Sequence, residues 1–492
     1  MSVTFEKLNP SQLKKAAIVP QVLDNQWIPR KLLSKMIKKG QKLDEVGKER
    51  KKHILKEWRR ALVYGEQVVV NRAFMFNNSV VVDDYDDAEN RQQFKQLLNS
   101  GVIALYLLGE DNPDQKPRFQ VDDRLWNTWL EIVNDTSMNC VRLDWGDQND
   151  DFKRLARIFH NYIQTLNKQE RAEAFAAHFG IRKREFPAFR ERLREVAFYA
   201  FEMASKRDII RNDLYENFIV EEGSNVALGQ YSKKPFAAEI KQIVDLKYNV
   251  NLPDALGRYS LTPQDSPPRS ALGDLDDVIN SKPISNKKID EILYALRRLA
   301  FENVAQGLYI KSLGVLNLSD VIKIRGTKEW HAYNRSIHKL LDNPLDFSQR
   351  SAEVYRRFAA LNQVITRTKV ESTKAKWEPW IKFMITLGTS TISLWLNPVD
   401  AQQRFMTTVA TGTIATGVTP FVMRLSVAAL AEMDADLEVS LDFMRGTIAN
   451  GRDTWNEMLG QLKSRSDFQL VGKAVTDALD ANQSPPETMG EL

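Results

Sequence analysis

The feature that most restricts the fold of this chain of 492 residues is an alternation of short apolar runs with amphipathic segments between residues 65 and 166. The apolar runs cover 65–76, 101–110 and 138–145, and helical periodicity covers 90–100, 121–136 and 150–166. Continuous apolar runs are typical of strands in a parallel sheet that is covered on both faces. The pattern therefore predicts an α/β domain over 61–185, built from strand and helix units.

Polar side chains follow each predicted strand, at the edge where α/β proteins bind their ligands. Asn71 and Arg72 follow the first strand, Glu110 the second, and Asp144 and Asp147 the third. Carboxylates beside an arginine could hold Mg²⁺ and a phosphate group, because hard cations prefer oxygen ligands. We predict catalytic roles for Arg72, Glu110 and Asp144, and ligand binding by Asn71 and Asp147.

The acidic stretch VVDDYDDAEN lies between the first predicted strand and the next helix. If that strand continues past Phe74, Asp83 and Asp84 join the predicted ligand-binding residues at the same edge. The alternative interpretation is that the acidic residues only cap the following helix. No glycine-rich phosphate loop follows any of the strands, which argues against a standard ATPase or dehydrogenase.

Positive charge is concentrated early in the chain, in residues 30–60. Leu32, Leu33 and Met36 have helical spacing, as do Ile54 and Trp58, so region 1–60 is predicted to form amphipathic helices with basic outer faces. Such faces could bind the phosphates of a nucleotide, of nucleic acid or of an anionic membrane surface. The alternative is an ordinary solvated helix surface.

The rest of the chain has a helical pattern. We predict helices with a connecting region rich in Pro, Ser and Asp over 186–285, a helical domain over 286–480, and a disordered tail over 481–492. The predicted fold class is therefore an N-terminal α/β domain with a parallel sheet, followed by a predominantly α-helical C-terminal half.

Residues 381–431 contain two apolar segments that are rich in Gly and Thr and are joined by a turn at Asn397 and Pro398. The first is shorter than the roughly 20 apolar residues that span a bilayer, and Pro420 interrupts the second. Gly388, Gly412 and Gly417 would let helices approach closely in a membrane or in a soluble bundle. The hairpin is thus either part of a soluble core or a segment that enters a membrane or an oligomer interface.

Cysteine usage and the N-terminus bear on the compartment. A single cysteine, Cys140, excludes an internal disulfide framework, so a reducing compartment is expected and Cys140 is predicted to be a buried apolar residue. The N-terminus has no apolar signal core. We expect a cytoplasmic protein, and if residues 381–431 do enter a membrane, we expect this to happen on activation.

Three functions are compatible with these features. The first is a two-part effector, similar in layout to bacterial defence effectors, in which the α/β domain senses or processes a phosphorylated ligand and the helical half forms a homo-oligomer or attacks a membrane. The second is a nuclease or nucleotide-processing hydrolase that uses the strand-end carboxylates. The third is a non-enzymatic helical scaffold. The sequence leaves open whether the protein is an enzyme.

Overall fold

The computed structural model describes residues 5–369 apart from internal gaps. The gaps are 25–26, 109, 118, 143–162, 205, 207–210, 227–228, 265, 267–293, 295–296, 299, 303, 306–307, 309–312 and 343–346. The chain forms two compact units. The first comprises Met1–Lys168, Pro187–Pro267 and Ile310–Lys328, and the second comprises Gln169–Phe186, Pro268–Tyr309 and Glu329–Leu492.

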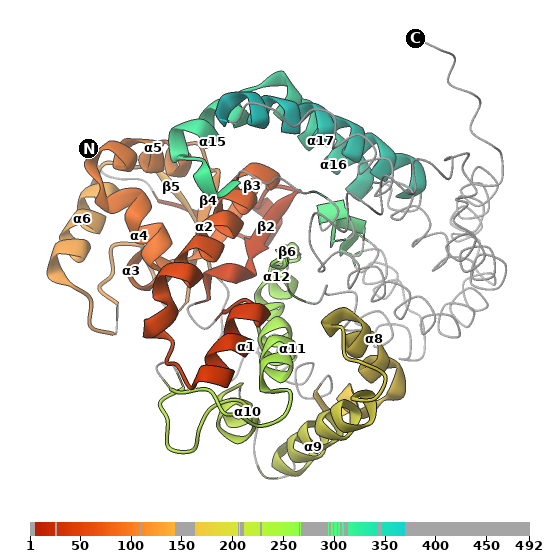
Figure 1. Ribbon diagram of the computed structural model, residues 1–492. Helices are drawn as coiled ribbons and strands as arrows, with labels where there is room; N and C mark the ends of the chain where they lie inside the picture. Colours follow the sequence, from red (N-terminus) through yellow and green to blue (C-terminus); the bar gives the residue numbers. More distant parts are fainter. Residues whose placement is uncertain are drawn as a thin grey trace, which may run out of the picture. The chain divides into compact units, whose positions relative to one another are not determined.

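The first unit is built on a sheet of six strands in the order β1-β5-β4-β3-β2-β6 (Figure 1). Every strand pair is parallel, which confirms the predicted parallel sheet. The strands are β1 (Phe5–Leu8), β2 (Ala17–Pro20), β3 (Gln67–Asn71), β4 (Ile103–Leu107), β5 (Met138–Arg142) and β6 (Tyr259–Leu261). The sequence predicted β3, β4 and β5. It did not predict β1, β2 and β6, because three or four residues are too few to give a pattern.

Helices connect neighbouring strands from β2 to β5. They are α1 (Arg30–Lys39), α2 (Gly47–Tyr64), α3 (Phe74–Asn77), α4 (Ser79–Asp86), α5 (Ala88–Asn99) and α6 (Asp123–Asn134). Helix α2 packs against β2 and β3, and α5 packs against β4 and β5. Side chains alternate along a strand, so these helices contact the side chains on one face of the sheet. The side chains on the other face pack against a different set of residues.

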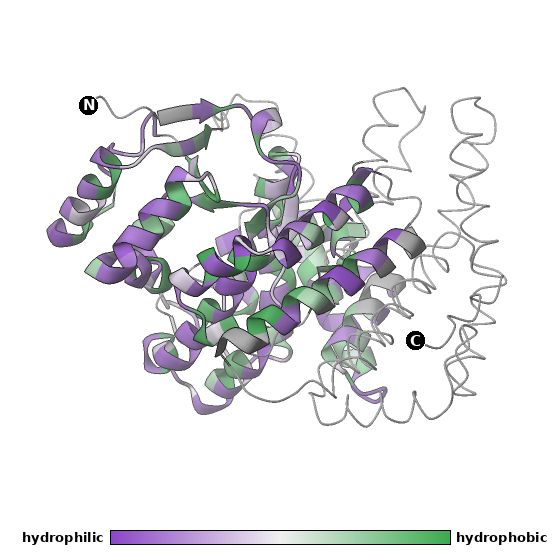
Figure 2. Ribbon diagram, turned by 90° about the horizontal axis from the view of Figure 1, so that it is seen from above, coloured by the Kyte–Doolittle hydropathy of each residue, from purple (hydrophilic) through white to green (hydrophobic). Residues whose placement is uncertain are grey.

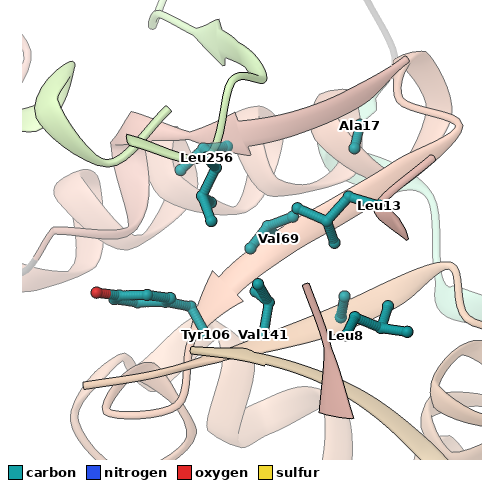
Figure 3. Packing of buried hydrophobic residues seen from close by; sticks show 9 residues of the cluster. Leu8, Leu13, Ala17, Val69, Tyr106, Val141 and Leu256 are labelled. Carbon is teal, nitrogen blue, oxygen red and sulfur yellow. The ribbon is translucent and has the colours of Figure 1, made fainter. Parts of the chain in front are cut away.

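An apolar cluster occupies that second face (Figure 3). Val69, Tyr106 and Val141 extend from β3, β4 and β5, and Leu256, which follows α12 (Asn251–Ala255), packs against them. Cys140, one position before Val141, is 2% exposed, which confirms the prediction that this cysteine is buried. Both faces of the central strands are therefore covered, as their continuous apolar sequences require.

Residues 186–266 contribute more to the sheet than their turn-rich composition indicated. They form α9 (Phe186–Ala204), α10 (Arg211–Phe218), α11 (Ala237–Asn249), α12 and the edge strand β6. Ile243, Val244 and Leu246 of α11 are at most 3% exposed, and α11 contacts α1. Part of the predicted connecting region thus completes the α/β unit.

A later segment, residues 313–328, also belongs to the first unit. Its helix α15 (Leu318–Arg325) packs against α2 and α5. The buried guanidinium of Arg325 donates hydrogen bonds of 2.7 Å to the carbonyls of Leu62, Gly65 and Glu66, at and beyond the C-terminal end of α2. Burial lowers the pKa of Arg325 to about 10. The arginine therefore caps a helix that begins more than 270 residues earlier in the chain.

The described part of the second unit is helical. It contains α8 (Gln169–Phe179), α16 (Lys328–Asp342) and α17 (Phe347–Lys369). Trp330, Tyr333 and Ile337 form the buried stripe of α16, and the helices carry separate hydrophilic and hydrophobic stripes (Figure 2). The predicted hairpin at 381–431, with Gly388, Gly412, Gly417 and Pro420, lies outside the described residues, as does the predicted tail. No helix between residues 5 and 369 that the structure describes is long and apolar enough to cross a membrane.

Candidate functional site

Two of the predicted catalytic residues, Arg72 and Glu110, meet at the carboxyl edge of β3 and β4. Strand β3 ends at Asn71, and the backbone N–H of Arg72 still donates to the Tyr106 carbonyl of β4 at 2.9 Å. The Arg72 side chain is 1% exposed, and its Nη2 lies 3.1 Å from Oε1 of Glu110. The structure therefore brings Arg72 and Glu110 into contact, and their predicted catalytic roles stay predictions.

The same guanidinium holds the loop after β4. Nη1 of Arg72 donates to the carbonyls of Pro113, at 3.0 Å, and Gln115. The indole N–H of Trp129 donates to the same Pro113 carbonyl at 2.9 Å. On the other side of the ion pair, Oε2 of Glu110 accepts from the backbone N–H of Leu108 at 2.6 Å. Arg72 and Glu110 together fix the course of loop 110–115.

An aromatic cluster lies beside this ion pair. The Arg72 guanidinium is 5.4 Å from the ring centroid of Phe76, and Phe76 lies 6.4 Å from Phe119 and 5.7 Å from Trp126. Phe119 is 44% exposed, and Leu108 at the end of β4 is 51% exposed. The edge therefore offers an apolar and partly aromatic surface next to a buried positive charge, and a flat aromatic ligand could stack on such a surface.

Two further arginines with acidic partners lie near this edge. Arg142, the last residue of β5, pairs with Asp111, and Arg124 at the start of α6 pairs with Asp86. The side chains of Arg142 and Asp111 are 47% and 70% exposed. Exposed pairs of this kind exchange partners at little cost, so these arginines are accessible to an anionic ligand.

Asn71 has a local role in the structure. Its side-chain Oδ1 accepts from the backbone N–H of Ala73 at 2.9 Å, which closes the turn between β3 and α3. The other two predicted residues of this edge, Asp144 and Asp147, lie outside the described residues. The predicted roles of Asp144 and Asp147, and of any Mg²⁺ they would hold, stay predictions.

Asp83 and Asp84 do not lie at the strand end, because β3 stops at Asn71 and residues 79–86 form α4. Asp84 is buried and accepts from Nη1 of Arg59 at 2.6 Å and from the indole N–H of Trp58 at 2.8 Å. Asp83 faces solvent and pairs with Lys51 at 2.5 Å. Val80, Val81 and Tyr85 form the buried face of this helix. The run of valines was compatible with a continued strand, because valine is enriched in strands.

Another part of the acidic stretch fits the alternative interpretation. Oδ1 of Asp87 accepts from the backbone N–H groups of Glu89 and Asn90, both at 3.0 Å. Asp87 is therefore the N-cap of α5.

A second charged cluster, in the interior, was not identified from the sequence. Nζ of Lys241 lies 2.5 Å from Oδ2 of Asp245, and the hydroxyl of Tyr215 donates to Oδ1 of the same carboxylate. Arg211 pairs with Asp24 at 2.7 Å. Burial lowers the pKa of Lys241 and raises the pKa of Tyr215. The available signal was the sequence AAEIKQIVDLKY, where a lysine and an aspartate stand four residues apart within an apolar run.

The basic run 30–60 divides by residue type. Its four arginines all contact residues outside the run: Arg30 pairs with Glu239, Arg50 bonds the Trp27 carbonyl, Arg59 pairs with Asp84, and Arg60 bonds the Thr262 carbonyl. Most of its lysines face solvent. The predicted basic outer faces of α1 and α2 therefore consist of lysines.

Within the described ranges, no group of three or more His, Cys, Asp or Glu side chains is placed to hold a metal ion.

Comparisons with known proteins do not identify a relative. No protein-family model, no curated protein and no solved structure matches the chain.

Proposed function

We propose that the chain is a two-part effector. In this proposal the α/β unit senses an anionic ligand of the nucleotide type at the carboxyl edge of β3 and β4. Residues 381–431 then respond by forming a homo-oligomer or by acting on a membrane. One observation carries the proposal: the carboxylate of Glu110 joins the buried Arg72 guanidinium to the backbone N–H of Leu108.

This bridge suggests how binding would change the edge. A ligand phosphate that pairs with Arg72 replaces Oε1 of Glu110, so the guanidinium, which is almost completely buried, keeps an anionic partner throughout. Glu110 is free to leave because its side chain is 19% exposed, and water can solvate the released carboxylate. Its departure also removes the acceptor of the Leu108 N–H, so loop 110–115 moves when the ligand binds.

The surroundings of Arg72 favour a ligand that combines an anion with a flat ring. Phe119 and Trp126 contact Phe76, which lies against the guanidinium. Arg142 at the end of β5 supplies a second, accessible cation. A nucleotide has both groups, a phosphate for the arginines and a base for the aromatic side chains.

The hydrolase alternative has less support from the described residues. Both carboxylate oxygens of Glu110 accept hydrogen bonds, and so do both oxygens of Asp84. Carboxylates occupied in this way must lose a partner before they can bind a metal or take a proton. Sensing requires only the exchange of one anion for another at Arg72.

Titration calorimetry on the full chain with ATP, NAD and cyclic di-GMP tests the proposal. At least one of these should bind, and Glu110→Gln should increase its affinity about tenfold, because a neutral amide competes less well for Arg72. Asp83→Asn is the matched control, since Asp83 is exposed and pairs with Lys51 of α2 instead of with an arginine of the edge. Failure of all three nucleotides to bind, or equal affinity in the two variants, would overturn the proposal.

The response of the second half is tested separately with liposomes and by light scattering. The nucleotide that binds should cause leakage of anionic liposomes or an increase in molar mass. Changing Gly412 and Gly417 to Asp should abolish that response and leave nucleotide affinity unchanged. A response that survives in this variant would rule out residues 381–431 as the working segment.

A further inference from the structure

The outer face of α1 carries a cluster of lysines that have no acidic partner in the part of the chain that the structure describes. Lys35, Lys38, Lys39 and Lys42 are all exposed. Among the described residues, no carboxylate pairs with their ammonium groups, and α1 has no acidic residue in its first turn. Helix α1 ends at Lys39 and is capped by Gly40, whose φ is 67°, and Lys42 follows two residues later. These four lysines form a compact basic surface, here named the α1 lysine face, with Glu45 at its margin, where Oε2 accepts from the backbone N–H of Lys42 at 3.3 Å.

The apolar side of α1 is already used by the protein. Leu32, Leu33 and Met36 are at most 3% exposed, and the helix contacts α11. A helix that binds by insertion into a bilayer must present apolar side chains to the lipid. Because those of α1 are buried in the core, its contacts with a partner are electrostatic only.

The face also has no aromatic side chain that could stack on an unpaired base. The aromatic residue of the basic run, Trp58, is 0% exposed, and its indole N–H is bonded to Asp84. Stacking on aromatic side chains is the main way in which proteins hold single strands. A partner of α1 is therefore recognised through its phosphates and not through its bases.

We infer that the α1 lysine face binds the phosphate backbone of double-stranded nucleic acid without reading its sequence. A helix of ten residues is about 15 Å long, and a duplex presents about nine phosphates over that length. Three lysines on the helix and Lys42 just beyond it can each neutralise a phosphate. The site is independent of the nucleotide site at Arg72, so the failure of one proposal leaves the other standing.

The chain offers a matched control for this proposal. Lys35 and Lys39 are four residues apart on α1, and Lys48 and Lys52 are four residues apart on α2. All four are exposed. Lys35→Gln with Lys39→Gln and Lys48→Gln with Lys52→Gln therefore remove the same charge from the same basic run, but only the first pair belongs to the α1 lysine face.

Fluorescence anisotropy on the full chain, with two unrelated 20-base-pair DNA duplexes, makes the test. The α1 variant should lose about tenfold in affinity for both duplexes, and its plot of log affinity against log salt should flatten by about 1.8, the slope of two phosphate contacts. The α2 variant should stay within about twofold of the parent protein. Circular dichroism establishes that both variants are folded.

Several results would overturn the inference. One is the absence of duplex binding by the parent protein, and another is an equal loss in the two variants, which would show an effect of total charge. Tighter binding of single strands than of duplexes would also contradict it. So would binding to vesicles of anionic lipid that the α1 variant loses, if duplexes do not bind, because the partner would then be a membrane surface.

Discussion

The two charged clusters of the α/β unit differ in how much water reaches them. At the carboxyl edge, Arg72 bonds mainly to backbone carbonyls, and the side chain of its partner Glu110 is 19% exposed. In the interior, Lys241 and Tyr215 both bond to the carboxylate of Asp245, whose side chain is 6% exposed. An ion pair at the edge can give up one partner to water or a ligand, whereas an ion pair in the interior cannot. Burial therefore separates the cluster suited to binding from the cluster suited to stability.

The largest effect is expected for the interior cluster. Asp245→Ala leaves the ammonium group of Lys241 and the hydroxyl of Tyr215 without their common acceptor, in a place that water does not reach. We expect the free energy of unfolding in urea to fall by about 3–5 kcal/mol. Asp83→Ala is the control, because its pair with Lys51 is exposed and should contribute less than about 1 kcal/mol. Similar losses in the two variants would remove the distinction between the clusters.

Arg72→Met should cost less, about 2–3 kcal/mol. Methionine keeps an apolar chain against Phe76 but cannot donate to Pro113, Gln115 or Glu110. Because these bonds hold loop 110–115, the effect should be local. Hydrogen exchange measured by mass spectrometry should show faster exchange in this loop and unchanged exchange in α11. Faster exchange in α11 as well would mean that Arg72 supports the whole unit.

A smaller effect is expected for the chemical labelling of Cys140, the single cysteine, which lies near the carboxyl edge. Burial raises the pKa of the Cys140 thiol to about 12, from an ordinary value of 9.0. Below pH 9 the thiol is protonated in both the folded and the unfolded chain, and the stability that it contributes is fully present. As the pH rises from 9 towards 12 this contribution is lost, because the unfolded chain gives up the proton first. Labelling with a disulfide reagent at pH 8 should therefore be slow in the native protein.

The neighbouring arginine provides the comparison for this labelling. The positive charge of Arg72 lowers the pKa of Cys140, although less than burial raises it. At pH 8, Arg72→Met should reduce the thiolate fraction and therefore the labelling rate, so an increase in labelling rate would show that the substitution also opens β5. Cys140→Ser is the blank. Rapid labelling of the parent protein would contradict the burial of β5.

The smallest effect is expected for Glu110→Gln. The amide oxygen still accepts from the Leu108 N–H or from Arg72, and water can reach the side chain. The free energy of unfolding should change by less than about 1 kcal/mol, against a much larger loss for Asp245→Asn. A loss from Glu110→Gln as large as that from Asp245→Asn would show that the edge cluster is as closed as the interior one.

The sequence was most informative where a single element carries its own signal. Continuous apolar runs predicted β3, β4 and β5, and the rule that ligands collect at strand ends selected Arg72 and Glu110. The valines before Asp83 are equally compatible with strand and helix, and only the burial of Tyr85 and Asp84 decides for α4. Lys241 and Asp245 were missed because their meaning depends on Tyr215 and on the elements that cover them. Such long-range burial leaves little trace in the local pattern.

The cap that Arg325 places on α2 has a consequence for how the protein is made. The carbonyls of Leu62, Gly65 and Glu66 emerge early from the ribosome, but their donor follows roughly 260 residues later. Leu316, whose carbonyl accepts from the buried Arg59, is equally late. During synthesis the sheet can assemble around its central strands, but the C-terminal end of α2 lacks its hydrogen-bond donor until residues 313–328 have been made. A chain that stops before Ile310 would hold the candidate ligand site on an unfinished domain, so the α/β unit cannot be separated from the rest by a simple cut.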